Sequence, residues 1–99
     1  MAWTVELSRT AARQFSKLDN PLKIRIKDFI VKLSAMDNPR HNGKVMQGQY
    51  SDYYRYKVGD YRLICHIEDS KMLITFIQLE HRKRFTENLL KRYGFTLPD

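Results

Sequence analysis

The feature that most constrains this sequence is a two-residue turn, Gly59-Asp60, between two strand-like segments. Residues 53–58 before it and 61–68 after it are rich in aromatic and β-branched residues, which favours strands. Glycine at the first central position is typical of a tight hairpin turn. A turn this short fixes the register, because Val58 must then face Tyr61 across the ladder. The sequence therefore predicts a β-hairpin whose side chains can be assigned to faces by counting.

Counting outward from the turn divides the hairpin into two faces. One face is mainly apolar and suits packing against helices; it holds Tyr54, Tyr56, Val58, Tyr61, Leu63 and Cys65. The other face holds Tyr53, Arg55, Lys57, Arg62, Ile64 and His66. Lys57 lies directly opposite Arg62, and a like-charge pair of this kind is destabilising. Because Arg55 adds another cation and no compensation is evident nearby, we interpret this face as a candidate functional site rather than a solvated edge.

The remaining pattern alternates between strand and helix. Besides the hairpin, the expected elements are a strand at 2–7, a helix capped by Ser8, a second helix capped by Asn20 and ending near 37, a loop at 40–52, a fourth strand at 72–79 and a helix at 81–93. The prediction is one α+β domain over residues 1–99, with the order β-α-α-β-β-β-α. A small antiparallel-rich sheet of about four strands would carry an N-terminal helical hairpin on one face and a C-terminal helix.

The composition restricts the partners, sites and cellular compartment that we expect for this chain. The 99 residues include 18 Lys and Arg against 11 Asp and Glu, and the net charge of +7 is typical of a protein with a polyanionic partner such as nucleic acid. A single cysteine excludes an internal disulfide and a multi-thiolate metal site, and it suits a reducing compartment. No apolar run is long enough to cross a membrane and no signal peptide is evident, so we expect a cytoplasmic protein.

A second basic group, His81-Arg82-Lys83-Arg84, begins where the last strand is expected to end. At that position it can converge on the cationic face of the hairpin. The sequence lacks a serine–histidine–aspartate order, a phosphate loop, metal-ligand spacing and paired carboxylates. Clustered Lys, Arg and His suit a metal-free attack of an RNA 2′-hydroxyl on the adjacent phosphate, which needs a base, cations and an acid but no cofactor. The alternative is a plain nucleic-acid-binding module, which needs only phosphate contacts.

The segment Tyr-Arg-Tyr-Lys-Val-Gly-Asp-Tyr-Arg-Leu at 54–63, the apolar strand at 72–79 and His81-Arg82-Lys83 resemble the RelE/ParE toxin superfamily. The resemblance covers almost the whole chain. The RelE branch comprises metal-independent endoribonucleases of bacterial type II toxin–antitoxin pairs, which cut mRNA codons in the ribosomal A site. The ParE branch poisons DNA gyrase and generally lacks the complete basic array. The resemblance therefore implies a RelE-like mRNA interferase, with a ParE-like gyrase inhibitor as the alternative.

The resemblance also implies roles for individual residues. By position, Arg55 and Lys57 match the family's alternating basic pair, and Arg62 matches the arginine after the turn. Arg82 matches the arginine beyond the last strand. Lys57 is the expected base, with His81 as the runner-up. Arg55 and Arg62 would hold the scissile phosphate, and Arg82 would assist the leaving group.

The family's further tyrosine has no clean counterpart, because Phe85, Thr86 and Asn88 occupy its neighbourhood. His81, Phe85 and Tyr93 stay open as replacements. Additional RNA contacts are expected from Lys83, Arg84, Phe85 and Tyr93. The expected partners are a cognate antitoxin, the ribosomal decoding site with its mRNA, and operator DNA through the antitoxin complex alone.

Overall fold

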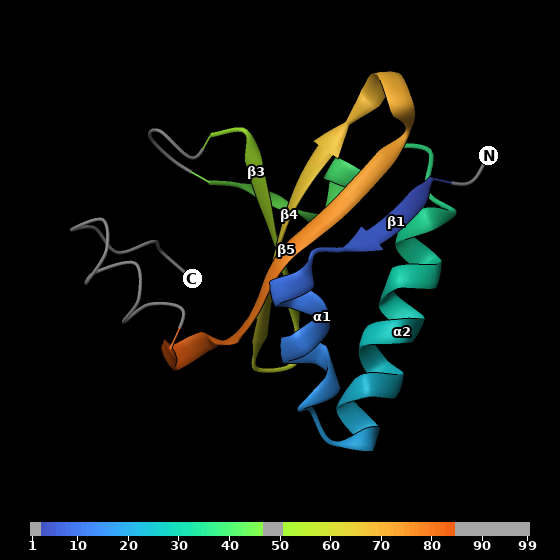
Figure 1. Cartoon of the computed structure of the whole chain (residues 1–99). Coiled ribbons are helices and arrows are strands. Elements are labelled where there is room, and N and C mark those ends of the chain that lie inside the picture. The colour runs from blue at the N-terminus through green and yellow to red at the C-terminus, as the bar shows by residue number, and fades with distance from the viewer. Residues whose placement is uncertain (1–2, 47–50, 85–99) are drawn as a thin grey trace.

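One five-stranded sheet organises the computed structural model, which describes residues 3–46 and 51–84 (Figure 1). The elements are β1 (Thr4–Leu7), α1 (Arg9–Ser16), α2 (Asn20–Ser34), a 3₁₀ helix (Pro39–Asn42), β2 (Lys44–Val45), β3 (Tyr53–Val58), β4 (Tyr61–Glu68), a second 3₁₀ helix (Asp69–Lys71) and β5 (Leu73–His81). The strand order is β1-β5-β4-β3-β2. β1 runs parallel to β5, and the other three pairings are antiparallel. The predicted α+β, antiparallel-rich class is therefore confirmed.

The fifth strand, β2, lies in the segment that was expected to be a loop, residues 40–52. Lys44 pairs with Arg55, and Val45 pairs with Tyr54. Two residues are too few to show strand periodicity, so this strand exists only through its pairing with β3. The predicted count of about four strands is corrected to five by this pairing.

Two element boundaries also differ from expectation. His81 was expected to begin a helix, but it is the last residue of β5 and pairs with Tyr61. Helical backbone follows at residues 82–84, and the rest of the expected C-terminal helix lies outside the described residues. The cap of α2 is Asp19 rather than Asn20, because the Asp19 carboxylate accepts from the N–H of Leu22 at 3.0 Å.

The predicted hairpin register is confirmed. Val58 pairs with Tyr61, and Lys57 pairs with Arg62. Gly59 adopts a φ of +59°, which glycine accepts without the strain that a Cβ would add. The backbone conformation of the turn therefore suits the glycine that the sequence places there.

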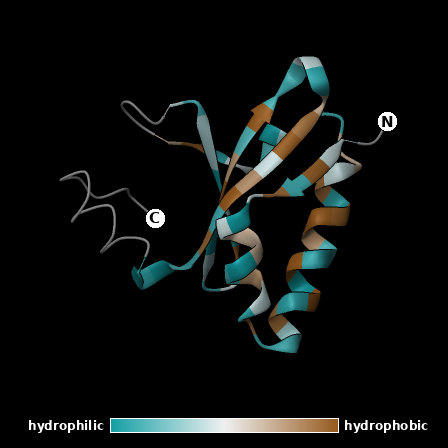
Figure 2. Cartoon of the chain, viewed as in Figure 1, coloured by the Kyte–Doolittle hydropathy of each residue, from teal (hydrophilic) through white to brown (hydrophobic). Residues whose placement is uncertain are grey.

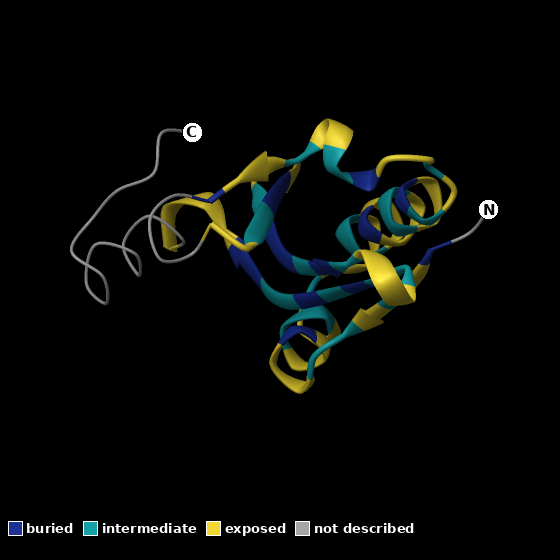
Figure 3. Ribbon diagram, turned by 90° about the horizontal axis from the view of Figure 1, so that it is seen from above, coloured by how far each residue is buried: buried dark blue, intermediate teal, exposed yellow. Residues whose placement is uncertain are grey.

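The hairpin face that was predicted to be apolar packs into the core, or against it in the case of Tyr54 and Tyr61. The buried residues of the core are Trp3, Ala11, Ile26, Leu33, Tyr56, Val58, Leu63, Cys65, Ile67, Ile74, Phe76 and Leu79. Figure 2 shows apolar residues on α2 and along β5, and Figure 3 shows that the outward sides of the helices are exposed. The rings of Phe29 and Tyr56 lie 5.3 Å apart, which joins α2 to β3. Burying each large apolar side chain contributes about 1.5–3 kcal/mol.

Helix α1 protects the edge of β5 beyond the point where β1 ends. The Ser8 hydroxyl donates to the carbonyl of Ile77 at 3.1 Å and also caps α1 by accepting from the N–H of Ala11. The N–H of Leu79 donates to the side-chain oxygen of Gln14 at 2.6 Å. These side chains satisfy strand groups that would otherwise be open to another chain.

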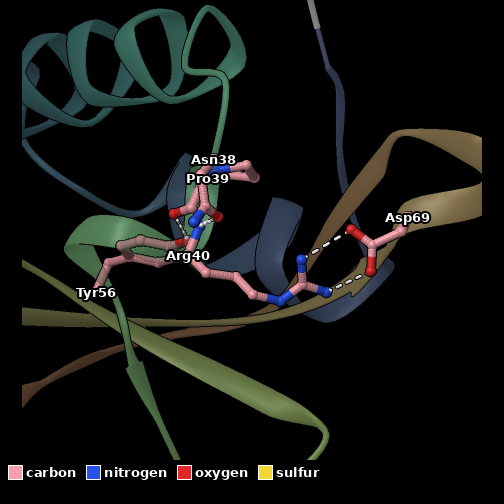
Figure 4. A network of polar contacts seen from close by, with 5 residues as sticks. All are labelled: Asn38, Pro39, Arg40, Tyr56 and Asp69. Carbon is pink, nitrogen blue, oxygen red and sulfur yellow. Dashed lines mark hydrogen bonds and ion pairs between the residues drawn. The ribbon is translucent and has the colours of Figure 1, made fainter.

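A polar network holds the segment between α2 and β2 against the sheet (Figure 4). Arg40 donates from both terminal nitrogens to the two carboxylate oxygens of Asp69, each at 2.8 Å. The hydroxyl of Tyr56 donates to the carbonyl of Pro39 at 2.5 Å. Burial raises the pKa of Tyr56, so this hydroxyl keeps its proton. Because Tyr56 is fixed, its neighbours in β3 are held on the opposite face of the sheet.

Candidate nucleic-acid interface

The hairpin face opposite the core carries Arg55, Lys57 and Arg62. Strand alternation puts Arg55 and Lys57 there, because Tyr56 and Val58 point into the core. Lys57 lies directly opposite Arg62 in the ladder. The predicted cross-strand pair of cations is therefore formed.

The three cations differ in exposure. Lys57 is exposed, whereas Arg55 and Arg62 are 6% and 3% exposed. Charged side chains this buried need compensating groups. Glu80, itself 8% exposed, lies opposite Arg62 on β5. A carboxylate therefore lies across the ladder from Arg62, on a face where no compensating group was evident from the sequence.

A β-bulge explains why Glu80 was not anticipated. The ladder between β4 and β5 shifts register between Ile64 and Cys65. Continuing the Glu68–Leu73 register along both strands without a shift would place Leu79 opposite Arg62. The bulge moves Glu80 into that place instead. The bulge thereby places the carboxylate of Glu80 on the cationic face, across from Arg62.

Arg82 is brought to the hairpin turn. Its backbone N–H donates to the carbonyl of Asp60 at 2.7 Å, and the residue is exposed. This hydrogen bond ties the second basic group to the end of the hairpin that carries Lys57 and Arg62. Of the second basic group, this contact joins the backbone of Arg82 alone to the turn.

His81 lies on the other face of the sheet from Lys57 and Arg62. It pairs with Tyr61, whose side chain belongs to the core-side face, and the two rings meet edge to face at 5.7 Å. The N–H of Lys83 donates to Nδ1 of His81 at 3.3 Å. The structure therefore separates the runner-up base from Lys57 and Arg62.

Lys83 and Arg84 are exposed and, with His81, line a groove beside α1. Phe85 and Tyr93, the other predicted RNA contacts, lie outside the described residues.

Burial raises the pKa of the Cys65 thiol to about 12, so this cysteine is not a nucleophile at neutral pH.

The part of the chain that the structure describes covers residues 3–46 and 51–84. In these residues, no group of three His, Cys, Asp or Glu side chains could hold a metal ion. None of the helices in that part of the chain is long and apolar enough to span a membrane.

Residues 5–85 match the family model of the ParE toxin of type II toxin–antitoxin systems. The chain belongs to this toxin family, within the RelE/ParE superfamily that its hairpin and second basic group resemble. The matched span contains the whole hairpin and residues 82–84. A search of curated proteins found no match.

Solved structures of RelE proteins share the fold. A chain of the RelBE2 toxin–antitoxin complex from Mycobacterium tuberculosis is 25% identical, with a TM-score of 0.74, over 83% of this chain and 93% of that chain. A mutant of the Escherichia coli toxin RelE in the free state is 22% identical, with a TM-score of 0.70, over 94% and 99%. A chain of the RelE–RelB complex from Pyrococcus horikoshii is 23% identical, with a TM-score of 0.68, over 85% and 99%. The RelE fold is thus confirmed, and the protein is a toxin of a type II toxin–antitoxin system.

Proposed function

We propose that this toxin is an mRNA endoribonuclease that cuts codons in the A site of cytoplasmic ribosomes, without a metal ion. The observation that carries the proposal is the grouping of Lys57, Arg62 and Arg82 at one end of the hairpin. These are the positions at which the superfamily resemblance implies catalytic residues. Phosphodiester cleavage by the RNA's own 2′-hydroxyl requires proton transfer and stabilisation of negative charge, which these side chains can supply.

Exposure suggests a division of roles. Lys57 is exposed, and in the neutral amine form its nitrogen would take the proton of the 2′-hydroxyl. Arg62 and Arg55 are enclosed, where fixed positive charge acts more strongly on the phosphate than it would in water. At 3% exposure, Arg62 touches a phosphate directly only after its surroundings open. Arg82, exposed at the turn, would assist the leaving 5′-oxygen.

The products follow from this chemistry. The 2′-oxygen forms a bond to phosphorus while the bond from phosphorus to the 5′-oxygen breaks. The upstream fragment then ends in a 2′,3′-cyclic phosphate. The downstream fragment begins with a 5′-hydroxyl, after its 5′-oxygen has gained a proton from a general acid.

A cognate antitoxin is the proposed protein partner. The structures similar to this chain include toxin–antitoxin complexes. An acidic, helical partner would complement the net charge of +7 and cover the cationic face. Operator DNA would be bound only through that complex.

The test compares Lys57→Gln with Lys32→Gln, a matched exposed lysine on α2. We expect Lys57→Gln to lower the rate of mRNA cleavage by about 10²–10⁴, the usual contribution of a positioned base, and Lys32→Gln to leave it unchanged. Wild-type fragments should carry cyclic phosphate and 5′-hydroxyl ends. Fragments with a 5′-phosphate, or full activity of Lys57→Gln, would contradict the mechanism.

Inhibition of DNA gyrase is the second candidate, because the matching family model is that of the ParE toxin. Such a toxin would trap cleavage complexes on supercoiled DNA and leave translated mRNA intact. Incubation with gyrase and supercoiled DNA separates the two candidates directly.

A further inference from the structure

Two aromatic side chains lie on the hairpin face that carries the cations, and the proposed chemistry does not use them. Tyr53 and His66 pair across the ladder between β3 and β4, and their ring centroids lie 5.8 Å apart in an edge-to-face contact. Tyr53 precedes Arg55 and Lys57 by two and four residues, so strand alternation places all three on one face. The aromatic pair and the cations therefore belong to one surface.

The pair lies at a defined distance from the cleaving end of this surface. Lys57 and Arg62 form one cross-strand row, and Tyr53 and His66 form the row four residues further from the turn. Four residues of a strand span about 13 Å. Because side chains stand roughly perpendicular to a sheet, the rings are too far from Lys57 to contact the ribose that would be cut there. They can contact a neighbouring nucleotide of the same RNA strand.

The rings are accessible to a ligand. Tyr53 and His66 are both half-buried, and 40% of the His66 side chain is exposed. The row between them and Lys57 holds Arg55 and Ile64, which are 6% and 5% exposed. Lys57 itself is exposed. The face thus offers two accessible places, a cation near the turn and an aromatic pair about 13 Å away.

The charges around the pair favour a nucleobase over a phosphate. Nδ1 of His66 lies 4.0 Å from Oε1 of Glu68, and Nζ of Lys71 lies 3.6 Å from Oε2 of the same carboxylate. A carboxylate beside the ring repels a phosphate. A nucleobase is uncharged, and every base has a π-face that can stack on an aromatic side chain. The pair therefore suits a base, while the phosphates of the same strand would lie toward the cations.

The neighbours of the pair do not form the apolar centre that is typical of a protein interface. The row that contains the pair continues with Thr75 on β5 and Glu6 on β1. Among the described residues of the two adjoining rows, the apolar side chains are those of Ile64, which is buried, and Leu73, which is half-buried. Aromatic rings that lie among polar groups and beside cations are instead typical of surfaces that bind single-stranded nucleic acid.

We propose that Tyr53 and His66 stack on one base of the bound mRNA and make the cleavage rate depend on that base, an inference that rests on the proposed endoribonuclease function. Stacking would fix the strand along the hairpin face and help to place the 2′-hydroxyl of the cut nucleotide at Lys57. Purines offer a larger ring than pyrimidines, so cleavage should be faster with a purine at the stacked position. Phosphate contacts alone would supply no such discrimination.

The test removes the base and the ring separately and together. Ribosomes with a tRNA in the P site and an empty A site are programmed with mRNAs that carry one abasic nucleotide, placed at each position around the cut in turn. An abasic nucleotide keeps its ribose and phosphates, so the base alone is lost. Cleavage rates are measured for the wild type, Tyr53→Leu and His66→Leu. The controls are Tyr53→Phe, which keeps the ring, and His41→Leu, which changes an exposed histidine of the first 3₁₀ helix.

We expect one abasic position to slow wild-type cleavage by about 5- to 150-fold, the usual range for one stacked base. The two leucine variants should cut intact mRNA more slowly and lose little further rate at that position, because the stacking contact is already absent. They should also lose the preference for a purine there. Both controls should behave as the wild type does at every position.

Two results would overturn the inference alone. One is a wild-type rate for both leucine variants on every mRNA, and the other is a loss that multiplies with the loss at every abasic position. Thermal unfolding shows that each variant is folded before its rate is compared. A wild type that cuts none of the mRNAs would overturn the proposed function, and this inference with it, so the two failures are distinguishable.

Discussion

Replacement of Arg62 should cost stability as well as cleavage. The Arg62 side chain is 3% exposed, and it lies opposite Glu80, which is 8% exposed. Arg62→Ala would remove the cation that lies opposite this enclosed carboxylate in the ladder. Removing one member of a buried oppositely charged pair costs about 3–5 kcal/mol. A change of 1 kcal/mol shifts the Tm of a domain of this size by about 4–8 °C, so the Tm should fall by at least about 12 °C.

Replacing both members should restore most of that loss. In Arg62→Met with Glu80→Met neither charge is buried, and such apolar replacements are often neutral in stability. The double variant should melt well above Arg62→Ala, yet it should not cut mRNA. Lys57→Gln changes an exposed residue and should stay within about 0.5 kcal/mol of wild type.

Thermal unfolding of the wild type, of the single variants Arg62→Met and Glu80→Met and of the double variant, followed by circular dichroism, measures the coupling between Arg62 and Glu80. A wild-type Tm for Arg62→Ala would refute the argument that Glu80 compensates this arginine. A double variant destabilised by the sum of the single variants would refute it as well.

Three further predictions concern the fold. Gly59→Ala should cost about 1–2 kcal/mol, read from the urea midpoint, because φ is +59° at this residue. The Arg40 guanidinium holds the pKa of Asp69 below its usual range, so this ion pair should stabilise the fold at neutral pH and lose its effect as the pH falls through the lowered pKa of Asp69. Asp69→Asn should therefore lower the urea midpoint at pH 7, and by less as the pH falls through the lowered pKa of Asp69, whereas Asp37→Asn, an exposed control, should not show this difference. The Cys65 thiol, buried and with its pKa raised to about 12, should react with a disulfide reagent at pH 8 only after denaturant is added.

The hairpin could be predicted because two local rules act together. A two-residue turn fixes the register, and alternation along a strand then assigns each side chain to a face. The opposition of Lys57 and Arg62 followed from these rules alone and is present in the structure. The same rules identified the core face that holds Tyr56 and Leu63.

What could not be predicted depends on contacts between distant segments. The bulge at Ile64 and Cys65 has no signature in the local pattern, yet it decides which residue of β5 faces Arg62. It also leaves His81 paired with Tyr61 on the core side, away from Lys57. The burial of Arg55 and Arg62 could not be predicted either, because alternation assigns a side chain to a face but does not say how far that face is covered.

Primer extension on an mRNA translated in a purified system tests the central claim most directly. The reaction is run with and without the toxin, beside the same mRNA free of ribosomes and in EDTA. We expect cuts within codons that appear only on translating ribosomes and that are lost with Lys57→Gln. Intact mRNA and normal translation in the presence of the wild-type toxin would contradict the account.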